Sequence, residues 1–262
     1  MSSVKGSLKI ISKFKVYHNI IKRNMCTVTY LPLGNNNFIL TSNRDEAPLR
    51  KTIPPTEYLE DGVELTYPKD ELAGGTWIGL SDKKRLVCLL NGGFRIHTRQ
   101  SSYKMSRGVI VKKILSSDDG VDFINNFDFY NIEPFTLILV DWSNQLKTYE
   151  LVWDGKIKHF NKLAQESAIW SSSTLYTEEM KALRKNWFAD WVLENDEFKQ
   201  EEILEFHQQE NLGNREVSIK MKRDTVETVS ITSVKKVESE IKMRYLDFVN
   251  SSKTIQKKLM LQ

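Results

Sequence analysis

Residues 25–46 read MCTVTYLPLGNNNFILTSNRDE and predict the first hairpin of the protein. Residues 27–30 alternate apolar and polar side chains as a β-strand does, and residues 34–37 are a glycine-asparagine turn. Residues 38–42 then predict a second strand. The expected hairpin carries Cys26 near one end, and its second strand runs into the sequence Asn-Arg-Asp-Glu.

Cys26 directly follows Met25, and this position has chemical consequences. If the chain began at Cys26, one residue would carry both a thiol and a free α-amine, which are the nucleophile and base of a self-contained unit. If the preceding bond is intact, Cys26 is an ordinary cysteine near a strand start. Arg44 within about 4–6 Å would favour the thiolate by about 1–3 pK units. Asp45 is expected to orient the α-amine.

The composition limits the classes of protein that need to be considered. The chain has 262 residues, of which 40% are hydrophobic and 27% charged, which is typical of one large globular domain. No run of 18 apolar residues predicts a membrane-spanning segment. The two cysteines predict no disulfide framework and fit a reducing compartment. The four histidines lack metal-ligand spacing, so we expect no metal site.

The positive charge is concentrated at the N-terminus. Residues 1–24 contain six basic residues and no acidic one, which leaves 32 basic against 34 acidic residues in the body from Met25 onward. No basic stripe in this body indicates nucleic-acid binding. The segment 1–24 is interpreted as a mitochondrial-type presequence, a propeptide, or upstream sequence read in frame. The body, residues 25–262, is expected to be a single cytoplasmic domain, or a mitochondrial one if the first interpretation holds.

The rest of the chain predicts blocks of strands and helices rather than a βαβ repeat. Residues 47–70, rich in proline and acids, are expected to form irregular loop with short extended pieces. In the helix expected at 177–194, the stripe of Met180, Leu183, Trp187, Phe188 and Trp191 predicts core packing. The other expected strands are 74–80, 85–90, 135–142, 148–153, 156–160, 225–234 and 237–248, and the other expected helices are 106–116, 119–127 and 197–210.

Five motifs occur in order along the chain: Met25-Cys26, residues 41–46 (TSNRDE), 74–79 (GGTWIG), 90–93 (LNGG) and 106–108 (SRG). Together they resemble the NRDE family, the family of the transport and Golgi organisation 2 proteins. The resemblance runs from Met25 to about residue 250. It implies an α+β fold, a four-layer αββα sandwich of two mainly antiparallel sheets, similar to that of the N-terminal-nucleophile (Ntn) hydrolases.

The resemblance also implies a site. Cys26 matches the nucleophile, Arg44 and Asp45 its electrostatic neighbours, and Asn91 the asparagine that stabilises an oxyanion. The substrate-binding residues are expected to be Asn43, Trp77, Arg107 and Arg223. Structural interpretations stand beside these: Arg44 and Asp45 as a buried pair that fixes a strand end, and residues 91–93 as a tight turn.

The sequence departs from the family pattern at two places. Residues 171–173 are Ser-Ser-Ser where the family carries an asparagine motif, and Lys222 stands where a threonine is expected before Arg223. The serine run weighs against full hydrolase function if that asparagine helps to hold an oxyanion.

Two functions therefore compete. One is a cysteine hydrolase or acyltransferase that acts on a small amide or thioester, with acyl-coenzyme A as one candidate and no cofactor required. The other is a non-catalytic carrier of haem or an acyl lipid on the same fold, in which Cys26 serves as a haem ligand. A third, a secretory-pathway organising protein, rests on the family name alone and predicts no site.

Overall fold

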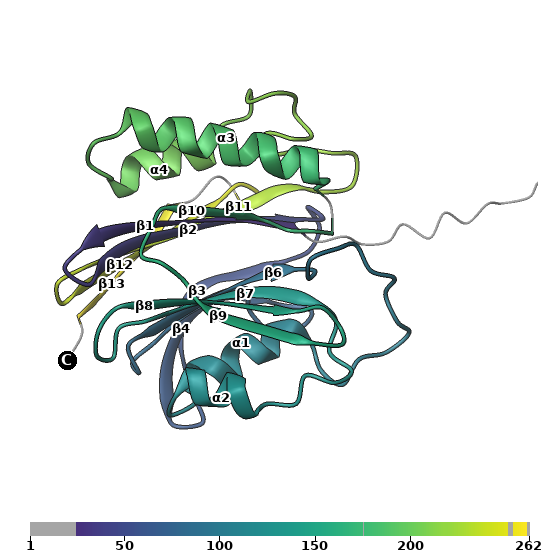
Figure 1. Cartoon of the computed structure of the whole chain (residues 1–262), viewed down its shortest axis with the longest axis vertical. Helices are drawn as coiled ribbons and strands as arrows, with labels where there is room; N and C mark the ends of the chain where they lie inside the picture. Colours follow the sequence, from purple (N-terminus) through teal and green to yellow (C-terminus); the bar gives the residue numbers. More distant parts are fainter. Residues whose placement is uncertain (1–24, 175, 251–253, 261–262) are drawn as a thin grey trace, which may run out of the picture.

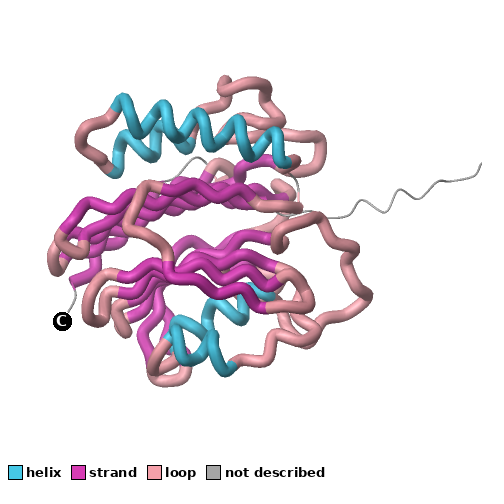
Figure 2. Tube along the Cα trace, viewed as in Figure 1, coloured by secondary structure: helices cyan, strands magenta, loops and turns pink. Residues whose placement is uncertain are grey.

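Two antiparallel sheets lie face to face between two pairs of helices (Figures 1 and 2). The structure is a computed structural model and describes residues 25–174, 176–250 and 254–260. The leader predicted at residues 1–24 lies outside the described residues. The expected four-layer αββα sandwich is confirmed.

The first sheet contains the hairpin expected from residues 25–46. In this hairpin Val28 lies opposite Ser42 and Tyr30 opposite Leu40, and Asn35 and Asn36 adopt φ angles of 49° and 61° in the turn. Its six strands lie in the order β10 (Ala168–Ser171), β1 (Met25–Gly34), β2 (Asn37–Glu46), β11 (Glu227–Val237), β12 (Glu240–Asp247) and β13 (Thr254–Met260).

The second sheet contains a hairpin that the sequence analysis missed. Its seven strands follow chain order: β3 (Thr52–Glu60), β4 (Val63–Asp70), β5 (Ile78–Ser81), β6 (Arg85–Asn91), β7 (Phe135–Asp141), β8 (Lys147–Trp153) and β9 (Lys158–Lys162). The prediction of irregular loop over 47–70 is therefore wrong from Thr52 onward. Pro54 and Pro55 are tolerated because β3 is an edge strand whose register shifts between Ile53 and Thr56.

The helices cover the outer faces of the sheets (Figure 1). Helices α1 (Arg107–Ser116) and α2 (Gly120–Asn126) lie on the second sheet, and α3 (Glu178–Glu194) and α4 (Gln200–His207) lie on the first. The stripe predicted for α3 is partly wrong: Phe188 is buried, but Leu183 is 46% exposed and Arg184 is fully buried. None of the described helices is long and apolar enough to cross a membrane.

The main core lies between the two sheets. Alternate residues of β1 and β2, such as Val28 and Leu40, pack against Ile78, Cys88 and Ile138 of the second sheet. Each fully buried aliphatic side chain of this kind contributes about 1.5–3 kcal/mol. Cys88 is fully buried in this core, where it packs as a small hydrophobic residue.

Candidate active site

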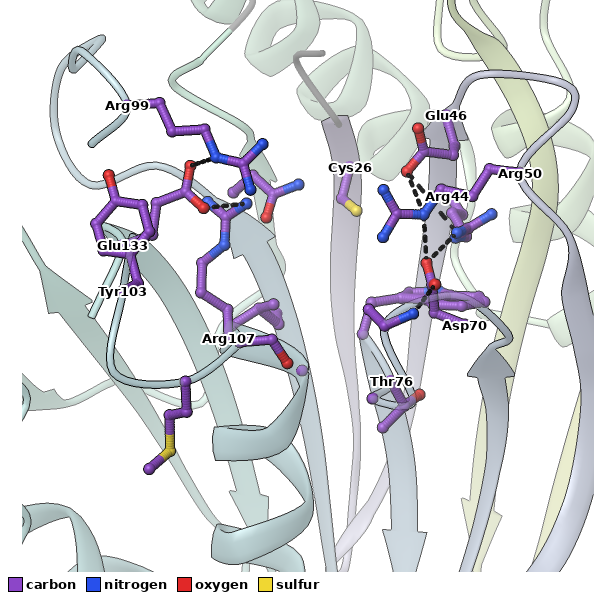
Figure 3. A pocket seen from close by; sticks show the side chains of 18 of the residues that line it. Cys26, Arg44, Glu46, Arg50, Asp70, Thr76, Arg99, Tyr103, Arg107 and Glu133 are labelled. Atoms are coloured by element: carbon purple, nitrogen blue, oxygen red, sulfur yellow. Dashed lines mark hydrogen bonds and ion pairs between the residues drawn. The ribbon is translucent and has the colours of Figure 1, made fainter. Parts of the chain in front are cut away.

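A cavity of about 610 Å³ opens where strands from both sheets end beside the start of α1 (Figure 3). Its walls come from the beginning of β1, the ends of β2, β4 and β6, and the segment that leads into α1. The described residues that line it include six of the eight predicted site residues: Cys26, Arg44, Asp45, Trp77, Asn91 and Arg107. They do not include the other two, Asn43 and Arg223.

The register of the first hairpin places Cys26 directly opposite Arg44. Residues directly opposite in an antiparallel pair share one face, and neighbours along a strand point to opposite faces. The thiol and the guanidinium therefore both face the interior of the sandwich. Cys26 is only 4% exposed. Met25, one residue earlier, pairs with Asp45.

A network of ion pairs holds Arg44 in place. Its Nη2 donates to Asp70 Oδ2 at 2.8 Å, and Arg50 Nε donates to the same oxygen at 2.7 Å. A carboxylate oxygen of Glu46 lies 3.8 Å from Arg44 and 3.5 Å from Arg50. Although burial opposes ionisation, Arg50, the Ala73 N–H and Arg44 together hold the pKa of Asp70 below its usual range. Asp70 is therefore the anionic centre that positions Arg44 beside the cavity.

Two glycines of the predicted motifs bring the walls together. A Cβ atom on Gly75 would lie 2.7 Å from the carbonyl carbon of Gly108, so only glycine permits this contact between backbones. The Thr76 N–H donates to the Gly108 carbonyl at 3.4 Å across the same contact. The next residue, Trp77, places its ring centroid 4.5 Å from the Arg44 guanidinium carbon in a cation–π contact. The GGTW and SRG motifs thus join the start of α1 to the Arg44 wall.

A second ionic cluster forms the opposite wall, with Cys26 between the two clusters (Figure 3). The carboxylate of Glu133 lies 3.3 Å from Arg107 Nη2, 3.9 Å from Arg99 Nε and 3.4 Å from His97 Nε2. Arg107 Nη1 also donates to the Pro134 carbonyl at 3.1 Å. The predicted substrate-binding residue Arg107 is thus brought to the cavity together with Arg99, which the sequence analysis did not select.

Asn91 ends β6 at the cavity, and a tight turn follows it. Gly92 has φ +87°, and a Cβ atom there would lie within 3 Å of both Ser173 and Thr174. The Asn91 carbonyl accepts a hydrogen bond from Ser172 Oγ. Ser173 Oγ is buried with no hydrogen-bond partner among the described residues. The serine run therefore packs against the Asn-Gly turn. Residues 91–93 form the expected tight turn, and Asn91 also lines the cavity.

Comparison with known proteins establishes the family. A sequence model of the family described as Transport and Golgi organisation 2 matches residues 25–253. The chain belongs to this family. No curated protein sequence matches the chain.

Solved structures similar to this family member share its fold. One is the Caenorhabditis elegans ortholog of N-acylethanolamine-hydrolyzing acid amidase, with a TM-score of 0.57, 13% identity, and coverage of 79% of this chain and 92% of that one. Another is a mutant of conjugated bile acid hydrolase from Clostridium perfringens, with a TM-score of 0.53, 8% identity, and coverage of 89% and 97%. The fold of this family member is therefore that of the Ntn hydrolases.

The thiol of this family member is held in its neutral form. Burial raises the pKa of Cys26 well above its usual value, and Cys88 and Asp45 raise it further, whereas Arg44 lowers it only in part. Arg44 therefore favours the thiolate, as expected, but burial outweighs its effect in a chain with residue 25 attached. Reaction at this sulfur requires a base that removes the proton.

Asp45 lies at the cavity edge and accepts hydrogen bonds from two hydroxyl groups. Thr228 Oγ1 donates to it at 2.6 Å and the Tyr176 hydroxyl at 3.4 Å. Burial raises the pKa of Asp45 to about 6, although Thr228 and Arg184 partly offset this shift. The role expected for Asp45, orienting a free α-amine of Cys26, stays a prediction.

Asn43 supports the sheet rather than the cavity. Its Nδ2 donates to the carbonyls of His207 and Ile219 at 3.1 and 2.9 Å, so its Oδ1 accepts from His207 Nδ1 at 2.6 Å. His207 Nε2 then accepts from Thr29 Oγ1 at 2.8 Å. Burial lowers the pKa of His207 to about 3, which keeps the ring neutral in this arrangement. Because side chains alternate along a strand, Asn43 and Arg44 point to opposite faces of the sheet, and this difference can be read from the sequence.

Arg223 and Arg184 lie outside the cavity, on the α3 side of the first sheet. Arg223 donates from Nε and Nη2 to the Glu216 carbonyl at 3.2 and 3.0 Å. The fully buried Arg184 donates to Thr27 Oγ1, and its guanidinium carbon lies 3.8 Å from the ring centroid of Tyr176. The sequence analysis missed Arg184. The available signal was its position four residues before Phe188, on the buried side of α3.

Proposed function

We propose that this protein, when its chain begins at Cys26, is a cysteine Ntn hydrolase or acyltransferase that acts on a small amide or thioester. One observation carries the proposal: Cys26 and Arg44 lie directly opposite each other on β1 and β2 and line one cavity with Asp45 and Asn91. The family and the Ntn-hydrolase fold support this assignment.

The buried thiol explains why a free α-amine is needed. Burial raises the pKa of Cys26, so Arg44 alone does not supply a thiolate. An α-amine has a pKa near 7.7–8.0 and is therefore largely available as a base at slightly alkaline pH. Because Met25 pairs with Asp45, the nitrogen of residue 26 follows directly after that pair, which supports Asp45 as the group that orients it.

The proposed reaction proceeds through an acyl-enzyme. The α-amine of Cys26 takes the thiol proton, and the sulfur attacks the substrate carbonyl. The Asn91 side chain and backbone N–H groups stabilise the oxyanion, a type of contact worth about 2.7–4 kcal/mol for one donor. The leaving amine or thiol takes the proton from the ammonium, which leaves a thioester on Cys26. Water, or a second acceptor, then attacks the thioester with the amine again as base. The carbon–sulfur bond breaks, the acyl product leaves, and the ammonium returns its proton to the Cys26 sulfur.

The test compares the two cysteines. Intact-mass and N-terminal analysis of protein from its own cells is expected to find a chain that begins at Cys26. Incubation with the hexanoyl thioester of N-acetylcysteamine should acylate that residue, as read by peptide mass spectrometry. Cys26→Ala should abolish the adduct and turnover, whereas Cys88→Ala, which alters a thiol outside the described cavity lining, should keep both. A chain that retains residue 25 and is equally active would overturn the proposal.

A non-catalytic carrier on the same fold is the second candidate, favoured by serine at 171–173 in place of an asparagine motif. For haem, four arginines and four carboxylates line the cavity, and these charged walls do not fit the apolar faces of the macrocycle. The carrier is therefore proposed for acyl ligands and not for haem. Tight haem absorbance that survives Cys26→Ser, with no thioester turnover, would overturn both the hydrolase proposal and the choice of acyl ligands over haem for the carrier.

A further inference from the structure

The arginines on the two sides of Cys26 are in different electrostatic settings (Figure 3). On the β2 side, Arg44 and Arg50 face two carboxylates, Asp70 and Glu46, and both donate to Asp70 at hydrogen-bond distances of 2.8 and 2.7 Å. On this wall two carboxylates balance the charges of two arginines, and both arginines already donate hydrogen bonds to Asp70. This wall frames the thiol and has little capacity for a further anion.

On the opposite side, two guanidinium groups share one carboxylate. Glu133 lies 3.3 Å from Arg107 and 3.9 Å from Arg99, both longer than the 2.7–2.9 Å typical of charge-assisted hydrogen bonds. Although burial opposes ionisation, His97, Arg107 and Arg99 hold the pKa of Glu133 below its usual range, so it is already an anion. This wall therefore carries an excess of positive charge. Each guanidinium has five N–H donors, and Arg107 gives one of its own to the Pro134 carbonyl.

The segment between these two arginines carries four residues with hydroxyl groups that also line the cavity: Ser101, Ser102, Tyr103 and Ser106. Ser106 is the N-cap residue of α1, yet its side chain makes no capping hydrogen bond, and the first turn of α1 contains no acidic residue. The N-terminus of a helix favours negative charge, which adds to the effect of the two arginines.

We propose that Arg99 and Arg107 form a subsite for an anionic oxygen group, a carboxylate or a phosphate, on the substrate that Cys26 attacks. The inference deepens the proposed function, because it names the charge class of the amide or thioester. The two charged walls lie on either side of Cys26, so a substrate bound through its anion at Arg107 can place a neutral acyl bond at the sulfur (Figure 3). Arginine binds such groups through two parallel N–H···O bonds, which fixes orientation as well as charge.

Binding to the Cys26→Ala variant tests the subsite separately from catalysis. The ligands are N-hexanoylglycine, its neutral amide N-hexanoylglycinamide, and N-hexanoyl-O-phosphoethanolamine, titrated by calorimetry at 0.15 M ionic strength. At least one anion should bind about tenfold to hundredfold more tightly than the neutral amide. Adding Arg107→Gln should remove most of this preference. Arg244→Gln, which alters an arginine paired with Glu201 outside the described cavity lining, should leave it unchanged.

The outcomes separate the two proposals. Tighter binding of the carboxylate, the phosphate or both supports the subsite and identifies the source of the anion. Equal affinities for all three ligands, no binding of either anion, or a preference that Arg107→Gln leaves intact would overturn it. Anion preference in the Cys26→Ala variant, with no turnover of any ligand by the chain that begins at Cys26, would leave the subsite standing and reject the hydrolase.

Discussion

Replacing Asp70 with asparagine tests whether the Arg44 wall depends on one buried charge. Asp70 Oδ1 accepts from the Ala73 N–H at 2.9 Å, while Oδ2 accepts from Arg44 and Arg50. An asparagine amide has one oxygen and one NH₂ group, so it cannot accept on both sides. If its oxygen faces Ala73, its NH₂ group faces two guanidinium groups. If it is flipped, the Ala73 N–H loses its partner.

The expected cost follows from the burial of the partners. The Arg44 side chain is 5% exposed, that of Asp70 is 11% exposed, and Glu46 at 3.8 Å remains as a weaker partner. Removing one member of a buried pair costs about 3–5 kcal/mol, and the remaining Glu46 lowers our expectation to about 2–4 kcal/mol. Urea unfolding at pH 7 measures this change directly, and a shift of the midpoint at constant slope would assign it to stability.

Glu201→Gln is the matched control. Glu201 also bridges two basic residues, Arg244 at 2.9 Å and Lys242 at 4.0 Å, but its side chain is 58% exposed. Exposed pairs of this kind contribute about 0–1 kcal/mol. If Asp70→Asn costs no more than Glu201→Gln, the buried carboxylate does not hold Arg44, and the account of this wall is wrong.

Two further substitutions address other contacts at the site. The folded pKa of Asp45, about 6, exceeds the ordinary value of 3.8, so the contribution of Asp45 to wild-type stability should fall as pH rises from about 4 to 6, by at most about 1.4 kcal/mol per unit. Asp45→Asn should lack this contribution, so the difference in unfolding free energy between wild type and variant, measured with urea, should change over this pH range; parallel pH profiles would contradict the shift. Gly75→Ala should cost about 1–3 kcal/mol, because its Cβ would meet the Gly108 backbone at 2.7 Å. An unchanged melting temperature would show that α1 moves away freely.

Local sequence patterns predicted much of the fold. Strand alternation and turn residues located the first hairpin, and the motifs of the NRDE family gave the layered architecture and six residues of the cavity. The prolines of β3 misled the analysis, because tolerance of Pro54 and Pro55 depends on β3 lying at a sheet edge. That position is a property of the whole sheet and leaves no signal in the local sequence.

The partners of the site residues were harder to predict. Asp70 lies 26 residues from Arg44, and Glu133 lies 26 residues from Arg107, so neither ion pair follows from local spacing. Arg44 and Asp45 look equivalent in the motif, although only Arg44 shares a face with Cys26. The effect of burial on the thiol pKa likewise depends on the facing sheet, which contributes Cys88.

Strand β1 begins at Met25, and its ladder with β2 already includes that residue. A purification tag fused upstream of Met25 is therefore compatible with a well-folded sheet, yet it would keep the nitrogen of Cys26 in a peptide bond. If Cys26 acts through its α-amine as proposed, such material folds normally and lacks activity. Assays of this protein should use a tag at the C-terminus, or a protease that leaves Cys26 as the first residue.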